Sequence, residues 1–262
     1  MKTLTLLTVC SALSLHSLAF AEVKVVIEHS SNDQAIPAFK FKNVPPPSRS
    51  DAATSAKFII VDGQRDNNGG DLEKLHDGQL PREEDQPSAN FFFAAGPAGG
   101  RIQIDLGAVT SIKQINTYSW HSDTRAPQVY RLYASAGDAD TFQAQPKKET
   151  APESCGWQLI AKVDTRPHAG PVGGQYGVSI ADSADLIGKY RYLLFDIDRT
   201  EDRDAFGNTF YSEIDVVDPN APQVAAAAAD TKPITNSFAT DDGKYHFTID
   251  ATTAPDLMDW AD

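Results

Sequence analysis

The sequence RIQIDLG (residues 101–107) decides the fold, together with three more apolar phrases: QVYRLYAS (128–135), YRYLLFDI (190–197) and FYSEIDVV (210–217). In the first phrase, aliphatic residues alternate with charged or polar ones, the period of two that gives a strand one buried and one solvated face. No helical stretch separates the four phrases. This part of the chain is therefore predicted to form a β-sandwich.

A main domain over residues 50–218 is predicted to contain nine short strands. They are 58–61, 90–93, 101–106, 112–119, 128–135, 157–163, 175–180, 190–197 and 210–217. Turn signals such as Asn68-Gly69-Gly70 and Gly99-Gly100 separate them. Because only parallel strands need long helical crossovers, we expect two antiparallel sheets rather than an α/β fold, closed as a jelly roll.

The four phrases, their order and the ending SEIDVV resemble the discoidin family, also called the coagulation factor five/eight C-type or galactose-binding-like domain. The resemblance covers the main domain. It implies an all-β, galactose-binding-like jelly-roll sandwich. It also implies a module that binds a ligand, such as a glycan or a cell-surface polysaccharide in adhesion, and does not catalyse.

The first 21 residues have the features of a secretory signal peptide. Met1-Lys2 supplies the basic start, an apolar run follows, and Ala19-Phe20-Ala21 is a small-residue cleavage site. We therefore expect a secreted protein, extracellular or periplasmic. Removal of the signal takes Cys10 with it, which leaves Cys155 without a partner for an intramolecular disulfide.

Composition argues against several classes of function. The formal net charge of −13 disfavours nucleic acids and anionic membranes as partners. No segment approaches the roughly 20 apolar residues that a membrane-spanning helix needs. Spaced catalytic signatures such as H-E-x-x-H and G-x-S-x-G are missing from the sequence, so we do not expect an enzyme.

Three further segments flank the main domain. Residues 22–49 read as an N-terminal strap that ends in the stiff Pro45-Pro46-Pro47. Residues 219–236 are rich in alanine and proline and are expected to be a linker, with a short helix as the alternative. Residues 237–262 look like the partial start of a second domain, with a strand at 244–250 and a helix opening at Thr253.

This last segment resembles the opening of the plant-type basic secretory protein family of zinc peptidases, through the phrase TAPDLMDWA at 253–261. The resemblance covers only the tail and includes no metal-binding helix. It implies an alternative function for the chain, as the accessory domain of a longer or truncated secreted metallopeptidase.

The pattern Leu75-His76-Asp77-Gly78 has two readings. In galactose-binding-like domains, an Asp-Gly after the first strand and a glutamate on the last strand commonly hold a structural calcium. The resemblance implies that the matching residues here are Asp77 and Glu213. Calcium takes carboxylate and carbonyl oxygens from loops that wrap around it, so the chemistry is suitable. Asp-Gly is equally a plain turn signal, and both readings stay open.

The predicted ligand site lies on two loops at one end of the sandwich. In the first loop, Trp120 could stack on a sugar ring while His121 and Arg125 donate hydrogen bonds to its hydroxyls. The second loop, residues 201–208, adds three candidates. They are Arg203, Phe206 and Asn208.

Two of the candidates in the first loop also have a purely structural reading. Trp120 stands at a strand end and could belong to the core. Arg125 could pair with Asp123 or with a carboxylate on a neighbouring loop.

Overall fold

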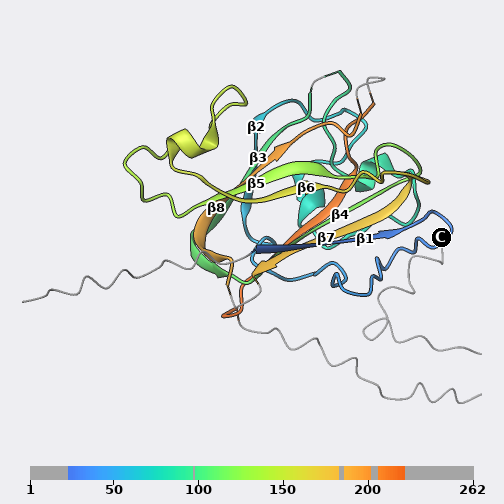
Figure 1. Cartoon of the computed structure of the whole chain (residues 1–262), viewed down its shortest axis with the longest axis horizontal. Helices are drawn as coiled ribbons and strands as arrows, with labels where there is room; N and C mark the ends of the chain where they lie inside the picture. Colours follow the sequence, from blue (N-terminus) through green and yellow to red (C-terminus); the bar gives the residue numbers. More distant parts are fainter. Residues whose placement is uncertain (1–22, 97, 183–185, 202–205, 222–262) are drawn as a thin grey trace, which may run out of the picture. The chain divides into compact units, whose positions relative to one another are not determined.

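The computed structural model describes residues 23–96, 98–182, 186–201 and 206–221 (Figure 1). They contain nine strands and three short 3-10 helices. The strands are β1 (Val23–Ser30), β2 (Lys57–Asp62), β3 (Gly100–Ile112), β4 (Gln114–His121), β5 (Val129–Ser135), β6 (Gln158–Asp164), β7 (Gly174–Asp182), β8 (Gly188–Ile197) and β9 (Tyr211–Val217). The 3-10 helices are η1 (Leu72–Leu75), η2 (Pro87–Ala89) and η3 (Pro152–Cys155).

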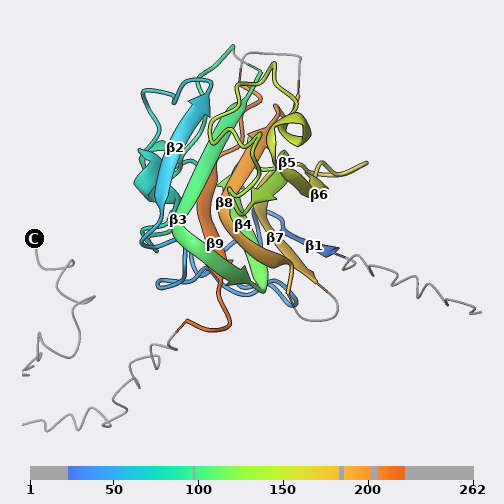
Figure 2. The same ribbon diagram turned by 90° about the vertical axis from the view of Figure 1, so that its left-hand side faces the viewer.

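The strands form two antiparallel sheets, which lie as two layers in Figure 2. The four-stranded sheet has the order β1-β7-β4-β9, and the five-stranded sheet has the order β2-β3-β8-β5-β6. The predicted all-β sandwich is confirmed. The fold belongs to the compact unit Met1–Asn220, and the second unit, Ala221–Asp262, lies almost entirely outside the described residues.

Alternation along the strands builds the core between the two sheets. On β3, Ile102 and Ile104 are fully buried in the main hydrophobic cluster, and they meet Ile214 of the opposite sheet in that cluster. The residues between them, Arg101 and Gln103, point to the outer face of the five-stranded sheet. The period of two in the sequence thus separates the core from the outer faces, as predicted.

Eight of the nine predicted strands are confirmed, with shifted ends. The prediction of a strand at 90–93 is wrong, because this stretch makes only isolated bridges, from Phe91 to Tyr211 and from Phe93 to Arg65. Its three phenylalanines alternate as a strand would, since Phe91 and Phe93 join the core while Phe92 points the other way.

The segment predicted as an N-terminal strap is an integral part of the sandwich. It begins with β1, which pairs with β7 along its whole length, from Val23↔Asp182 to Ser30↔Gln175. Its second half covers the outer face of the four-stranded sheet. There Phe39 is buried against Tyr118 and Trp120 in a separate aromatic cluster.

The outer face of the five-stranded sheet is covered as well. The segment between β5 and β6 folds over it and buries Trp157 and Cys155 against Tyr133 and Leu194. Cys155 is the free cysteine expected from the sequence, and it lies in this cluster.

Candidate functional site

Arg125 is the centre of an aromatic cluster at one end of the sandwich. Its guanidinium carbon lies 5.0, 5.1 and 4.8 Å from the ring centroids of Phe92, Phe206 and Phe210. The guanidinium Nε donates a hydrogen bond to the Phe206 carbonyl at 2.8 Å, and the Phe210 N–H donates to the Arg125 carbonyl at 2.9 Å. Contacts between a cation and aromatic rings at these distances are attractive. The loop between β4 and β5 is therefore tied to the segment before β9.

Phe206 is the outermost ring of this cluster. It is 57% exposed, whereas Phe92 and Phe210 are buried and stack on each other at 4.1 Å. A large exposed aromatic side chain beside a guanidinium is an amphipathic surface, with an apolar ring face next to fixed hydrogen-bond donors. The two predicted loops thus meet at one rim, and we call Arg125, Phe206 and His121 the rim site.

His121 lies at the end of β4, at the edge of the same cluster. Its ring is 4.6 Å from the Phe210 ring, edge-on at 72°. Its Nδ1 accepts a hydrogen bond from the Asp123 N–H at 2.9 Å, and its Nε2 lies 3.9 Å from the Asp85 carboxylate. Burial lowers the pKa of the imidazole, an effect that Asp85 opposes and Arg125 reinforces. With Nδ1 as an acceptor, the neutral ring carries its proton on Nε2, where it is a donor.

Trp120, the predicted platform, is not at the rim. It is only 4% exposed, and its ring packs edge-on against Phe39 with centroids 5.8 Å apart. Of the two readings left open by the sequence, the structure supports the core one. Successive strand residues point to opposite sides, so Trp120 faces the covered outer face of the sheet while His121 points the other way and lies against Phe210.

The second loop supplies one rim residue of the three predicted. Phe206 is at the rim, whereas Asn208 is buried and its Nδ2 donates to the Ala94 carbonyl at 2.8 Å. Asn208 thus anchors the loop to its neighbour. Arg203 lies outside the described residues. Sequence reasoning missed Phe92, although the run Phe91-Phe92-Phe93 contained a signal, because alternation must point the middle ring away from its neighbours.

Glu213 is the more informative of the two predicted metal ligands. It lies on β9, is 1% exposed and faces the covered side of the four-stranded sheet. Burial, followed by the charges of Asp215 and Asp77, raises the pKa of Glu213 to about 10, although a hydrogen bond from the Gly78 N–H opposes the rise. Its Oε2 is buried and makes no hydrogen bond within the described part of the chain. Such an oxygen is what a bound cation would satisfy.

Asp77 lies close to Glu213, but its oxygens already have partners. One accepts a hydrogen bond from the Gln79 N–H at 2.8 Å, as in an Asx turn, and the other pairs with the Lys74 ammonium at 2.7 Å. In residues 23–96, 98–182, 186–201 and 206–221, no three His, Cys, Asp or Glu side chains are grouped to hold a metal. The buried oxygen of Glu213 is a donor of the kind that calcium takes, while Lys74 competes for Asp77.

No helix within the described residues is long and apolar enough to cross a membrane.

Comparison with known proteins finds similarity in structure only. The chain matches no protein-family model and no curated protein. Solved structures similar to it include the module CpGH89CBM32-6 produced by Clostridium perfringens, at 13% identity and a TM-score of 0.39, covering 64% of this chain and 99% of that one.

Two further similar structures come from sugar complexes. A mutant of the lectin binding domain of lectinolysin, complexed with Lewis b, has 11% identity and a TM-score of 0.40, covering 65% of this chain and 97% of that one. A Ruminococcus gnavus GH29 fucosidase in complex with fucose has 14% identity and a TM-score of 0.38, covering 66% of this chain and 27% of the fucosidase. Of these three structures, the first two are binding modules or domains, and the third is an enzyme of which the match covers a part. At such scores the likeness carries no argument about function, and the fold rests on the strand pairing described above.

Proposed function

We propose that this chain is a secreted, noncatalytic module that binds carbohydrate at the rim site. The observation that carries the proposal is the exposed Phe206 ring held beside the guanidinium of Arg125 by a hydrogen bond of 2.8 Å. An aromatic face covers the C–H side of a pyranose, and directional donors next to it reach the ring hydroxyls. A glycan or cell-surface polysaccharide is the partner that fits, in a role such as adhesion.

The geometry of the rim is suited to binding without induced rearrangement. Three aromatic rings contact the Arg125 guanidinium, and the Arg125 carbonyl accepts a hydrogen bond from the Phe210 N–H. His121 is held by the Asp123 N–H. A site whose side chains are already in place loses less conformational entropy when a ligand binds.

The test is a glycan array followed by calorimetry on the whole chain and on two variants, each with one side chain shortened to alanine. Phe206→Ala should weaken binding of any sugar that the array identifies by about tenfold, because it removes the stacking surface. Val109→Ala is the control, since Val109 is equally exposed at 56% but lies on β3, outside the rim site. Equal affinities for the two variants would contradict the proposal, as would an array without a single bound glycan.

We also propose that a structural calcium ion binds at Glu213, with Asp77 as a second ligand. The buried, unpartnered Oε2 of Glu213 supports this, and a bound divalent cation would neutralise the carboxylates gathered there. The residues of this chain that would change are Asp77, which would exchange its Lys74 partner for the ion, and Glu213, which would be ionised.

Thermal unfolding tests the calcium proposal separately from sugar binding. Millimolar calcium should raise the Tm relative to EDTA, because an ion that binds only the folded state stabilises it. Glu213→Gln should abolish the shift, and Lys74→Met should enlarge it by removing the competing ammonium group. Identical melting curves in calcium and EDTA for the wild type would refute the proposal and favour the turn-only reading of Asp77.

The alternative role as accessory domain of a metallopeptidase stays a prediction from the sequence. The tail that carries it, residues 237–262, lies outside the described residues.

A further inference from the structure

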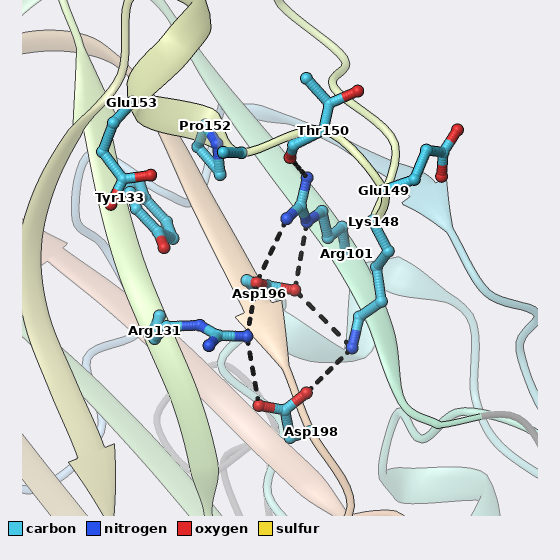
Figure 3. Close-up of a pocket in the computed structure, with 11 residues that line it drawn as sticks. Arg101, Arg131, Tyr133, Lys148, Glu149, Thr150, Pro152, Glu153, Asp196 and Asp198 are labelled. Carbon is cyan, nitrogen blue, oxygen red and sulfur yellow. Dashed lines mark hydrogen bonds and ion pairs between the residues drawn. The ribbon is translucent and has the colours of Figure 1, made fainter.

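A row of charged side chains crosses the outer face of the five-stranded sheet. Arg101 on β3 is in register with Asp196 on β8, and Asp196 is in register with Arg131 on β5. All three side chains point away from the core, and two ion pairs join them, at 3.1 Å for Arg101 and 2.9 Å for Arg131 (Figure 3). Neighbouring strands thus place opposite charges side by side.

The segment between β5 and β6 closes over one side of this row and leaves a pocket. The cavity has a volume of about 490 Å³, within the range of small-molecule sites. Arg131, Tyr133 and Asp196 come from the sheet, Lys148 and Glu153 come from the covering segment, and Asp198 follows β8 (Figure 3). The pocket shares no residue with the rim site.

The inner part of the pocket is rigid because its polar groups bind one another. The buried Arg101 donates two hydrogen bonds to Asp196 and three to carbonyls of the covering segment. The Lys148 ammonium donates to the Ala98 and Ile197 carbonyls at 2.8 Å each and to Asp198 at 3.0 Å. These groups form a floor and a wall, and all three nitrogens of the Arg101 guanidinium are engaged in them.

Other groups of the pocket keep hydrogen-bonding capacity. The side chain of Arg131 is 42% exposed, and its hydrogen bonds to Asp196 and Asp198 both come from Nη2. The side chain of Asp198 is 43% exposed, which leaves acceptor positions open beside its two ion pairs. Glu153 and the Tyr133 phenol line the opposite side (Figure 3). Donors and acceptors therefore face the same space.

The charges of the lining select against an ionic ligand. Three cationic and four anionic side chains line the pocket. An anion would meet Asp198 and Glu153, and a cation would meet Arg131 and Lys148, so either would be repelled by part of the wall. A neutral ligand with several hydroxyl groups can donate to the carboxylates and accept from the guanidinium without that cost.

We propose that this pocket is a second ligand site, which binds a neutral sugar through hydrogen bonds to Arg131, Asp198 and Glu153. It does not depend on the rim site, because the two share no side chain. A module with two such sites could hold two sugar residues of one polysaccharide, or two chains, at once.

The experiment is a titration of the whole chain with uncharged methyl glycosides of galactose, glucose, mannose, fucose and N-acetylglucosamine, followed by amide NMR. The amides of Thr150, Ala151 and Glu153 report on the pocket, and the amide of Gly207 reports on the rim. We expect one glycoside to move the pocket amides, with a Kd no weaker than about 50 mM. Asp198→Asn and Glu153→Gln should each weaken that Kd by about tenfold, because each removes a charged hydrogen-bond acceptor.

Two controls separate this proposal from the proposed function and from unfolding. Asp164→Asn removes an exposed aspartate that pairs with Arg166 on β6, outside the pocket, and should leave the pocket Kd unchanged. Phe206→Ala should abolish shifts at Gly207 and leave those at the pocket.

The outcomes are distinct. Shifts at Gly207 alone would overturn the second site and leave the rim proposal standing, whereas shifts at the pocket alone would do the reverse. Pocket amides that respond to sodium acetate or ammonium chloride but to no glycoside would overturn the neutral-sugar assignment.

Discussion

Replacing Arg101 by methionine is expected to lower the free energy of unfolding by about 3 kcal/mol. The Arg101 guanidinium is buried, and its five hydrogen bonds hold Asp196 and the carbonyls of residues 146, 147 and 150. Removing one partner of a buried ion pair costs about 3–5 kcal/mol, because the other charge stays buried. The lower end applies here, since Arg131 at 2.9 Å and Lys148 at 3.7 Å still contact Asp196.

Urea denaturation followed by tryptophan fluorescence measures this loss, with Trp157 in the adjoining cluster as a reporter. The matched control is Arg191→Met, which removes an arginine from the partly exposed pair with Asp105 at 2.8 Å and should cost less than about 1 kcal/mol. Adding Asp196→Leu to Arg101→Met should recover stability, because no buried charge remains. Equal stability of the two arginine variants would refute the reasoning, and so would a double variant weaker than Arg101→Met alone.

Three further predictions concern other parts of the fold. Phe39→Ala should lower stability by about 3–5 kcal/mol and shift tryptophan emission to the red as Trp120 gains water, which fluorescence during urea unfolding would show. The Arg191 hydrogen bond lowers the pKa of Asp105, so its stabilisation is present at neutral pH and is lost as pH falls below about 4; Asp105→Asn should flatten that acid limb of the Tm curve. Gly99→Ala should destabilise the fold, because its φ is +69° and a Cβ would collide with backbone of β8, and an unchanged Tm would contradict this.

The alternation of apolar residues was sufficient to predict the sandwich, because the apolar positions of a strand indicate which of its two faces is buried. Ile102 and Ile104 show this on β3. The same rule could not identify what covers an outer face. Trp120 looked like a possible platform because nothing in its own strand indicates that Phe39, more than 80 residues earlier, lies over it.

The candidate site was predictable at the level of loops and less so at the level of side chains. Arg125, His121 and Phe206 meet at one rim because the antiparallel order brings the loop after β4 to the segment before β9. Asn208 could not be distinguished from these rim residues, since the sequence does not tell whether an asparagine side chain is a buried anchor or binds a ligand. The charged row could not be found either, because the register that aligns Arg101 with Asp196 is set by strand pairing across 95 positions.

Because the outer faces of both sheets are covered, few surfaces of the molecule are open to a ligand. The aromatic cluster around Phe39 closes the outer face of the four-stranded sheet, and the cluster around Trp157 closes part of the other. A ligand therefore cannot lie along the whole outer face of either sheet, as it could on an open concave sheet. The two sites that we propose lie at the rim, where the loops end, and in the gap that the second cover leaves beside Arg131. Shortening the segment between β5 and β6 should therefore abolish the pocket while leaving the rim site intact, because Phe92, Phe206 and Phe210, which hold Arg125, belong to other segments.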